Sequence, residues 1–221
     1  MDRWASFDCY GTLIDWDGGL STTLENLWPE QDVDELLARY HEIEPRVQLQ
    51  PGLPYRDVLA ESLRLLAAHE GLGLDPRDET ALADALPRWE PFPEVPGSLD
   101  ELRARGWRLA ILSNTDPDFL EASIARIGIP IDVTVTAADA GSYKPAHGHW
   151  ETFLAQRDVD RTRYVHVAAS AFHDIEPCAE LGIPAFWINR LEESSDLPRA
   201  GELPDLNGLA DALERVVPAS L

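Results

Sequence analysis

The sequence predicts an α/β fold: a parallel β-sheet covered by helices on both faces, with an all-helical segment inserted after the first strand. Short apolar runs of β-forming residues recur at wide spacing, near residues 4–7, 107–112, 131–135, 164–167 and 185–188. Helical patterns separate the later runs, and strands that alternate with helices are typical of a parallel sheet. The stretch from about 15 to 95 holds helical patterns and no convincing strand.

The helices of the sheet region are predicted from capping residues and apolar spacing. Ser98 and Glu101 have the spacing of a capping box, which indicates a helix start. Asp116 has the position of an N-cap, and the helix after it is expected to end at Gly128. A further helix is expected to begin near Ala146.

The inserted segment is predicted to be a bundle of helices. Apolar residues at helical spacing indicate four of them, and Asp32 and Glu35 have the spacing that caps the second. The expected helices lie near residues 20–28, 33–43, 56–69 and 79–86. We therefore divide the chain into a core domain, residues 1–14 plus 96–221, and a helical cap domain, residues 15–95.

The composition excludes several classes of protein. The chain has 221 residues, 44% of them hydrophobic, which fits one globular domain that carries an insertion. No apolar run approaches the roughly 18 residues of a membrane span, the first residues do not resemble a signal peptide, and two cysteines are too few for a disulfide framework. A net charge of −22 repels nucleic acids and anionic membranes. We therefore expect a cytoplasmic protein that binds neither.

Polar residues follow four of the predicted strands. Asp8 follows the first, Ser113 and Asn114 follow the second, the loop with Lys144 follows the third, and the segment ending at Asp174 follows the fourth. Ligands of open parallel sheets bind beyond the carboxyl ends of the strands, so these side chains are expected to meet. Lys144 is the only lysine among 18 basic residues, which suggests a site that a guanidinium does not suit.

Four motifs appear in one order: FDCYGTL around Asp8, ILSN ending at Asn114, Lys144 followed by proline, and HVAASAFHD ending at Asp174. In this combination the sequence resembles the haloacid dehalogenase superfamily. The resemblance implies a Rossmann-like core with an inserted helical cap. It also implies that Asp8 is a nucleophile, that Thr12 orients it, and that Lys144 neutralises the crowded carboxylates.

Two positions favour one branch of this superfamily. The phosphatase branch usually has an acid two residues after the nucleophile, where this chain has Tyr10, and an acidic pair in the fourth motif, where this chain has Ala169. A Mg²⁺ site needs such carboxylate oxygens. The sequence therefore resembles the L-2-haloacid dehalogenase branch, which requires no metal or other cofactor. That branch uses an arginine from the cap, and Arg39 is the match.

The resemblance implies hydrolysis of small 2-haloacids. Asp8 would displace halide from C2 and form an aspartyl ester, while Arg39 would stabilise the halide. Asp174 would activate water, through Ser170 or His173, to release a 2-hydroxy acid of inverted configuration. The residues expected to contact the substrate are Tyr10, Ser113, Asn114, Trp150, Ser170 and His173.

Two alternatives stay open. A Mg²⁺-dependent phosphatase with an altered first motif would keep the same residues in the same geometric roles. A non-catalytic binding protein on the same fold would account for Ala168, Ala169 and Trp150, which depart from the patterns of the superfamily. The expected partner is a small anionic substrate, and a homodimer is a further expectation because this branch often forms dimers.

Overall fold

The computed structural model describes residues 2–50, 52–157 and 159–219. Its centre is a parallel sheet with the strand order β3-β2-β1-β4-β5-β6. The expected α/β fold is confirmed. The strands β2 and β3 lie on one side of β1, whereas β4 and β5 lie on the other side. The strand order therefore reverses beside β1, and ligands of such sheets bind at this point. The strands are β1 (Arg3–Phe7), β2 (Trp107–Ser113), β3 (Val133–Thr136), β4 (Tyr164–Ala168), β5 (Ala185–Ile188) and β6 (Gly201–Leu203).

The apolar runs form strands because both faces of the sheet are buried. Along β2, Leu109 and Ile111 join one core cluster, whereas Ala110 and Leu112 join the other. This alternation follows from the period of two along a strand. The third predicted run begins two residues later than expected, at Val133. The short strand β6 was not predicted, since the sequence Gly-Glu-Leu is too short to show alternation.

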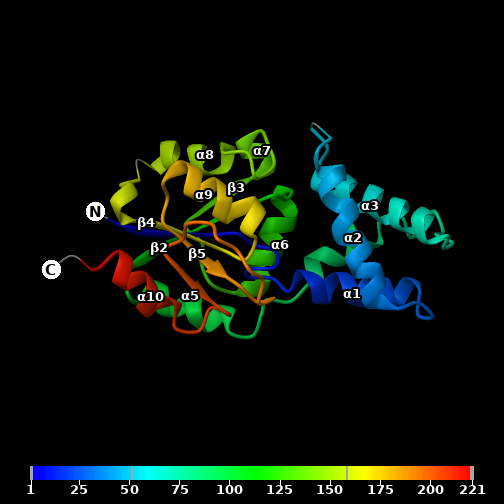
Figure 1. The fold of residues 1–221 in the computed structure, drawn as a ribbon, viewed down its shortest axis with the longest axis horizontal. Helices are drawn as coiled ribbons and strands as arrows, with labels where there is room; N and C mark the ends of the chain where they lie inside the picture. Colours follow the sequence, from blue (N-terminus) through cyan, green and yellow to red (C-terminus); the bar gives the residue numbers. More distant parts are fainter. Residues whose placement is uncertain (1, 51, 158, 220–221) are drawn as a thin grey trace.

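Helices cover both faces of the sheet (Figure 1). Apolar side chains of α8 (Gly148–Arg157) and α9 (Glu176–Leu181) pack on one face, and those of α5 (Val95–Ala104), α6 (Pro117–Ile127) and α10 (Leu209–Val216) pack on the other. Shorter elements join them: α7 (Ala137–Ala140), the 3₁₀ turn η2 (Arg161–Arg163) and the π-helical turn η3 (Ala171–Ile175).

The segment between β1 and α5 is helical, as expected. Figure 1 shows it at the side of the molecule opposite the two termini. Asp32 caps its second helix by accepting from the backbone N–H groups of Asp34 and Glu35. The domain boundaries at residues 15 and 95 stay a prediction. The elements are α1 (Trp16–Leu27), α2 (Val33–Gln48), α3 (Tyr55–Glu70), α4 (Ala81–Ala85) and the 3₁₀ turn η1 (Leu86–Arg88).

The chain leaves the sheet region and returns to it at neighbouring points. Ile14 and Pro91 form an isolated antiparallel bridge where the two crossings meet. Arg190, after β5, donates from Nη2 to the backbone oxygen of Thr12 at 2.9 Å and to Glu94 Oε1 at 2.6 Å. One side chain of the core thereby holds both crossings together.

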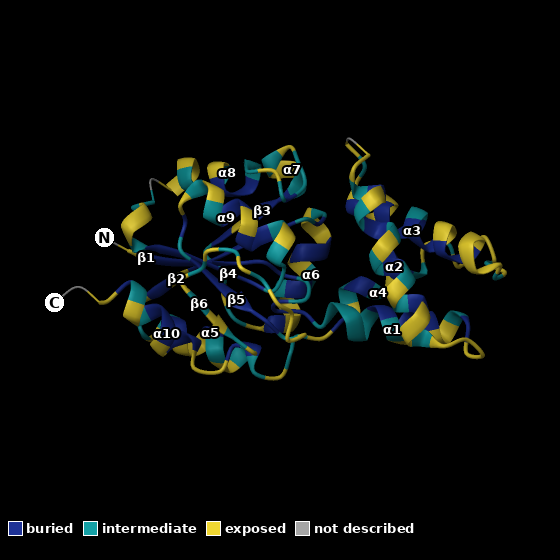
Figure 2. Cartoon of the chain, in the orientation of Figure 1, coloured by how far each residue is buried: buried dark blue, intermediate teal, exposed yellow. Residues whose placement is uncertain are grey.

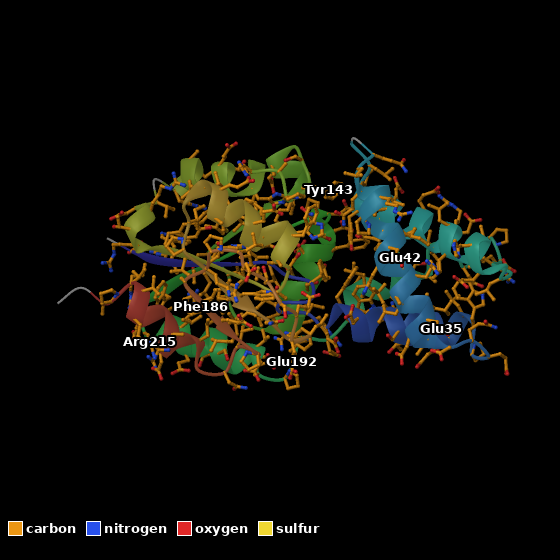
Figure 3. The ribbon with its side chains drawn as sticks, in the orientation of Figure 1. Glu35, Glu42, Tyr143, Phe186, Glu192 and Arg215 are labelled. Atoms are coloured by element: carbon orange, nitrogen blue, oxygen red, sulfur yellow. The ribbon has the colours of Figure 1, made fainter. Side chains whose placement is uncertain are left out.

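A second set of contacts joins the helical segment to the core. The Asp116 carboxylate accepts from the backbone N–H groups of Tyr55 and Arg56, each at 3.0 Å. Asp116 stands at the expected N-cap position of α6, but its side chain caps the start of α3 instead, since no side-chain cap bond forms within α6. Tyr143, labelled in Figure 3 on the side of the core that faces α2, donates to the Leu53 oxygen at 2.6 Å.

The expected capping box at Ser98 is wrong. The helix α5 begins earlier, at Val95, with Pro96 in its first turn, where the fixed φ angle of proline suits a helix start. Ser98 therefore lies inside the helix, and its hydroxyl donates to the Leu206 oxygen at 3.0 Å. The serine joins α5 to the segment before α10.

Burial follows these layers, as Figure 2 shows: the strands β1 to β5 are almost entirely buried, whereas the helices alternate between buried and exposed residues. This alternation is the pattern of helices that pack one face on a core. In the described parts of the chain, no helix has both the length and the apolar character that crossing a bilayer requires.

Candidate active site

A buried ammonium joins the two aspartates that follow β1 and β4. Lys144 Nζ donates to Asp8 Oδ1 and to Asp174 Oδ1, each at 2.7 Å, and to the Leu112 oxygen at 3.0 Å. Lys144 is only 2% exposed. Burial alone would lower the pKa of Lys144, but the charges of Asp174 and Asp8 outweigh it and raise that pKa. The lysine is therefore held in its charged form.

Two further side chains fix this cluster in place. Asn114, which follows β2, accepts from the backbone N–H of Lys144 at 2.6 Å and donates to its backbone oxygen at 3.0 Å. Thr12 Oγ1 donates to Asp8 Oδ2 at 2.9 Å and accepts from the backbone N–H of Ala169 at 2.9 Å. Both oxygens of Asp8 are therefore hydrogen-bonded, and its orientation is set by residues from three other loops.

Asp174 is held by a buried polar chain that the sequence did not reveal. His166 Nε2 lies 3.0 Å from Asp174 Oδ1, and Ser6 Oγ lies 2.7 Å from His166 Nδ1 and 2.6 Å from the Tyr164 hydroxyl. Burial would raise the pKa of Asp174, but the charge of Lys144 and hydrogen bonding by His166 hold it far below its usual range. Asp174 is thus held as a carboxylate near neutral pH.

A cavity of about 890 Å³ opens at this edge of the sheet. Its wall combines apolar and aromatic side chains, such as Tyr10 and Phe92, with polar ones. Ser113 contributes to the wall, and its buried hydroxyl has no hydrogen-bond partner among the described residues. The predicted site residues that line the cavity are Asp8, Tyr10, Ser113, Asn114, Lys144, Ser170, His173 and Asp174.

Two predicted site residues lie elsewhere. Arg39 pairs with Glu42 and Glu70 at the partly exposed boundary of α2 and α3, outside the cavity lining. Figure 3 labels Glu42 on this helix. The structure gives no support to the expected contact of Arg39 with the substrate, because Arg39 borders the apolar stripe of α2 on the flank that faces Glu70. Trp150 is fully buried in the core cluster, with its ring centroid 5.4 Å from that of His166, so its expected place beside the substrate is also wrong.

Residues of α2 that sequence reasoning did not assign line the cavity from the cap side. Glu44 is 3% exposed, and burial raises its pKa to about 7, against hydrogen bonding from Gln48 and Tyr55 and the charge of His41. Gln48 donates to Glu44 and accepts from Asn114 at 3.4 Å. Glu44 carries no sequence signal of its own, because a glutamate in a helix is ordinarily a solvated residue.

The fourth motif folds as a π-helical turn, η3. The Ile175 N–H donates to the Ser170 oxygen at 3.2 Å, which is the five-residue spacing of a π-turn. Ser170 Oγ accepts from the His173 N–H at 3.0 Å and lies 3.1 Å from His173 Nδ1. This turn brings both His173 and Asp174 to the cavity, with Asp174 fully buried and His173 partly exposed.

Comparison with known proteins agrees with this architecture. The family model of haloacid dehalogenase-like hydrolases matches residues 3–182. The (S)-2-haloacid dehalogenase of Pseudomonas sp. (strain YL) is 30% identical over 217 residues, which are 90% of this chain and 87% of the relative. A crystal structure of an L-2-haloacid dehalogenase superposes with a TM-score of 0.86 and 26% identity, over 96% of this chain and 99% of that chain. The L-2-haloacid dehalogenase of Xanthobacter autotrophicus with covalently bound chloropropionic acid has the same fold, with a TM-score of 0.85 and 20% identity over 97% and 99% of the two chains.

Proposed function

Because this chain belongs to the haloacid dehalogenase-like hydrolase family, we propose that it hydrolyses small 2-haloacids to 2-hydroxy acids through an ester on Asp8. The observation that carries the proposal is the contact of Lys144 with Asp8 at the wall of a large cavity. The 30% identical relative is named an (S)-2-haloacid dehalogenase, which supports the choice of substrate.

In the first step, a carboxylate oxygen of Asp8 attacks C2 of the haloacid from the side opposite the halogen. The new bond joins Asp8 to C2, the carbon–halogen bond breaks, and halide leaves with the bonding electron pair. Lys144 and Thr12 hold the attacking carboxylate, so little orientation is lost on the way to the transition state.

In the second step, water attacks the carbonyl carbon of the ester. The bond between that carbon and the ester oxygen breaks, which frees the 2-hydroxy acid and restores the Asp8 carboxylate. Because only the first step touches C2, the configuration at C2 is inverted. Lys144 stays beside the carbonyl oxygen throughout and offers its charge to the developing oxyanion.

Tyr10 bears on the choice between halide and phosphate chemistry. Its hydroxyl lies 3.0 Å from Ser123 Oγ, and burial raises the pKa of Tyr10 far above its usual range. A group so reluctant to give up its proton is a poor general acid for an alcohol leaving group. Halide leaves as a stable anion and needs no such acid, so Tyr10 is compatible with dehalogenation.

The donor set at the site does not fit a metal ion. Among residues 2–50, 52–157 and 159–219, no three His, Cys, Asp or Glu side chains gather as metal ligands do. The ammonium of Lys144 pairs with the carboxylates of both Asp8 and Asp174 and compensates their charge. We therefore propose a metal-independent reaction.

The test is halide release from 2-chloropropionate, 2-bromopropionate and chloroacetate, with and without EDTA. We expect halide and 2-hydroxy acid in equal amounts, no effect of EDTA, and no release by Asp8→Asn. Phosphate release from p-nitrophenyl phosphate that requires Mg²⁺, with no halide from any haloacid, would instead assign a phosphatase. Inactivity in both assays would favour a binding protein.

A further inference from the structure

The second step needs a group that accepts a proton from water, and Asp174 is badly placed for it. Asp174 Oδ1 already accepts from Lys144 and His166. Its other oxygen is enclosed and has no partner among the described residues, and the side chain is 1% exposed. The Lys144 charge that holds the pKa of Asp174 far below its usual range also makes it a weak base.

We propose that His173, presented by the π-helical turn, takes the proton from the water that hydrolyses the Asp8 ester. The imidazole belongs to the wall of the same cavity as Asp8. Its Nδ1 lies 3.1 Å from Ser170 Oγ. Its Nε2 makes no hydrogen bond within the described residues, and it is not among their enclosed polar atoms. This inference rests on the proposed function and adds a catalytic residue to it.

Ser170 positions the imidazole for this role. The Ser170 hydroxyl oxygen accepts from the His173 backbone N–H, and a second lone pair can accept from Nδ1–H of the ring. In that tautomer Nε2 carries no proton and is the free acceptor. The two contacts from one serine fix both the backbone and the ring of His173, so the ring is held before the substrate arrives.

Burial, more than the neighbouring charges, keeps the ring of His173 neutral and ready to accept a proton. Burial lowers its pKa, Asp174 on its own turn and Asp8 after β1 act in the opposite direction, and Lys144 lowers it further. A neutral imidazole accepts a proton near neutral pH far more readily than a carboxylate of low pKa does. Imidazole chemistry therefore suits this position.

The step balances as follows. The water oxygen bonds to the ester carbonyl carbon, and one water proton passes to Nε2 of His173. The tetrahedral intermediate then collapses, the bond to the ester oxygen breaks, and the departing alkoxide takes the proton back from the imidazolium. This transfer returns the ring to its neutral form. Asp8 is left as the free acid and loses its proton to solvent.

The decisive experiment is a rapid-quench comparison of wild type and His173→Gln with 2-chloropropionate. Glutamine keeps the polarity and approximate size of histidine but accepts no proton. We expect the variant to release one equivalent of halide per site at close to the wild-type rate. Its steady-state turnover should fall by about 100-fold or more, and mass spectrometry should find the substrate acyl group attached to the Asp8 peptide.

A matched control separates loss of a base from loss of any histidine. His147, which pairs with Glu180 outside the cavity, is replaced in the same way, and His147→Gln should turn over like wild type. If His173→Gln does not fold, His173→Asn gives the same comparison. Added imidazole should restore turnover to a His173→Ala variant, since the cavity has room for it.

The outcomes distinguish this inference from the proposed function. Turnover of His173→Gln at the wild-type rate would overturn the inference and leave dehalogenation standing. The same conclusion would follow if Asp174→Asn accumulated the ester and His173→Gln did not. Absence of the halide burst in His173→Gln would also overturn it, because His173 would then act in the first step. Absence of halide from wild type would refute the proposed function itself.

Discussion

Replacing Lys144 by methionine removes the buried ammonium and keeps most of the side-chain volume. The change in unfolding free energy therefore reflects the lost charge and not a newly formed cavity. The three acceptors of Lys144 Nζ, namely the carboxylates of Asp8 and Asp174 and the Leu112 oxygen, would lose their donor together. Removing one partner of a buried ion pair costs about 3–5 kcal/mol, because the other charge is left uncompensated. We expect Lys144→Met to lose about 4 kcal/mol of unfolding free energy at pH 7.

The pH dependence of this loss has a definite sign. In wild type the folded pKa of Asp174 lies below the unfolded value, so its stabilising effect is present above about pH 4 and is lost as the pH falls below that value. In Lys144→Met the buried carboxyl has no cation, and its folded pKa rises above the unfolded value. The deficit of the variant relative to wild type should therefore shrink by about 1.4 kcal/mol per pH unit between pH 7 and pH 5.

Urea unfolding followed by circular dichroism at pH 7 and pH 5 measures both effects. Arg64→Met is the control, since Arg64 forms exposed ion pairs with Glu61 and Glu79 and its loss should cost under about 1 kcal/mol at either pH. A Lys144→Met variant as stable as wild type at pH 7, or a difference in stability from wild type that is as large at pH 5 as at pH 7, would refute the reasoning.

Four further predictions follow from the site. Asp8→Asn should abolish halide release measured by ion chromatography while keeping a folded circular dichroism spectrum; retained turnover would remove the nucleophile. A single turnover in ¹⁸O water with excess enzyme should label the Asp8 carboxylate, and label found in the product alone would indicate direct attack by water. Arg39→Ala should change kcat by less than about twofold, since its partners Glu42 and Glu70 lie outside the cavity; a tenfold fall would return Arg39 to the site. Glu44 has a folded pKa of about 7, above the unfolded value, so its ionisation costs stability as the pH rises from about 4.5 to 7. Glu44→Gln should therefore gain about 2–3 kcal/mol relative to wild type between pH 5 and pH 8 in urea unfolding, and a constant difference would contradict the assignment.

The parts of the site that were predictable are those attached to strand ends. Asp8, Asn114, Lys144 and Asp174 each follow an apolar run, and parallel strands bring their carboxyl ends to one edge of a sheet. A residue that directly follows a strand can therefore be placed at this edge from the sequence. The scarcity of lysine then drew attention to Lys144, which the structure places between the two aspartates.

The parts that were not predictable depend on how helices pack. Arg39 and Glu44 lie on the same helix, and helical spacing places both near the apolar stripe without saying which flank meets the core. Packing of α2 against α3 turned Arg39 toward Glu70 and Glu44 into the cavity. Trp150 was misplaced for a similar reason, because a large aromatic residue on a helix beside the site fits the core as well as the pocket wall. Whether the chain forms a homodimer stays a prediction.

The two ends of the cap segment are held together by the Ile14–Pro91 bridge and by the two hydrogen bonds of Arg190. A segment whose two ends meet at one point can be replaced without rethreading the sheet. Replacing the helices between these two points by the corresponding helices of a relative would change the cap side of the cavity. The contact between Asp8 and Lys144 would be kept. The walls of the cavity thereby come from two separable stretches of the chain.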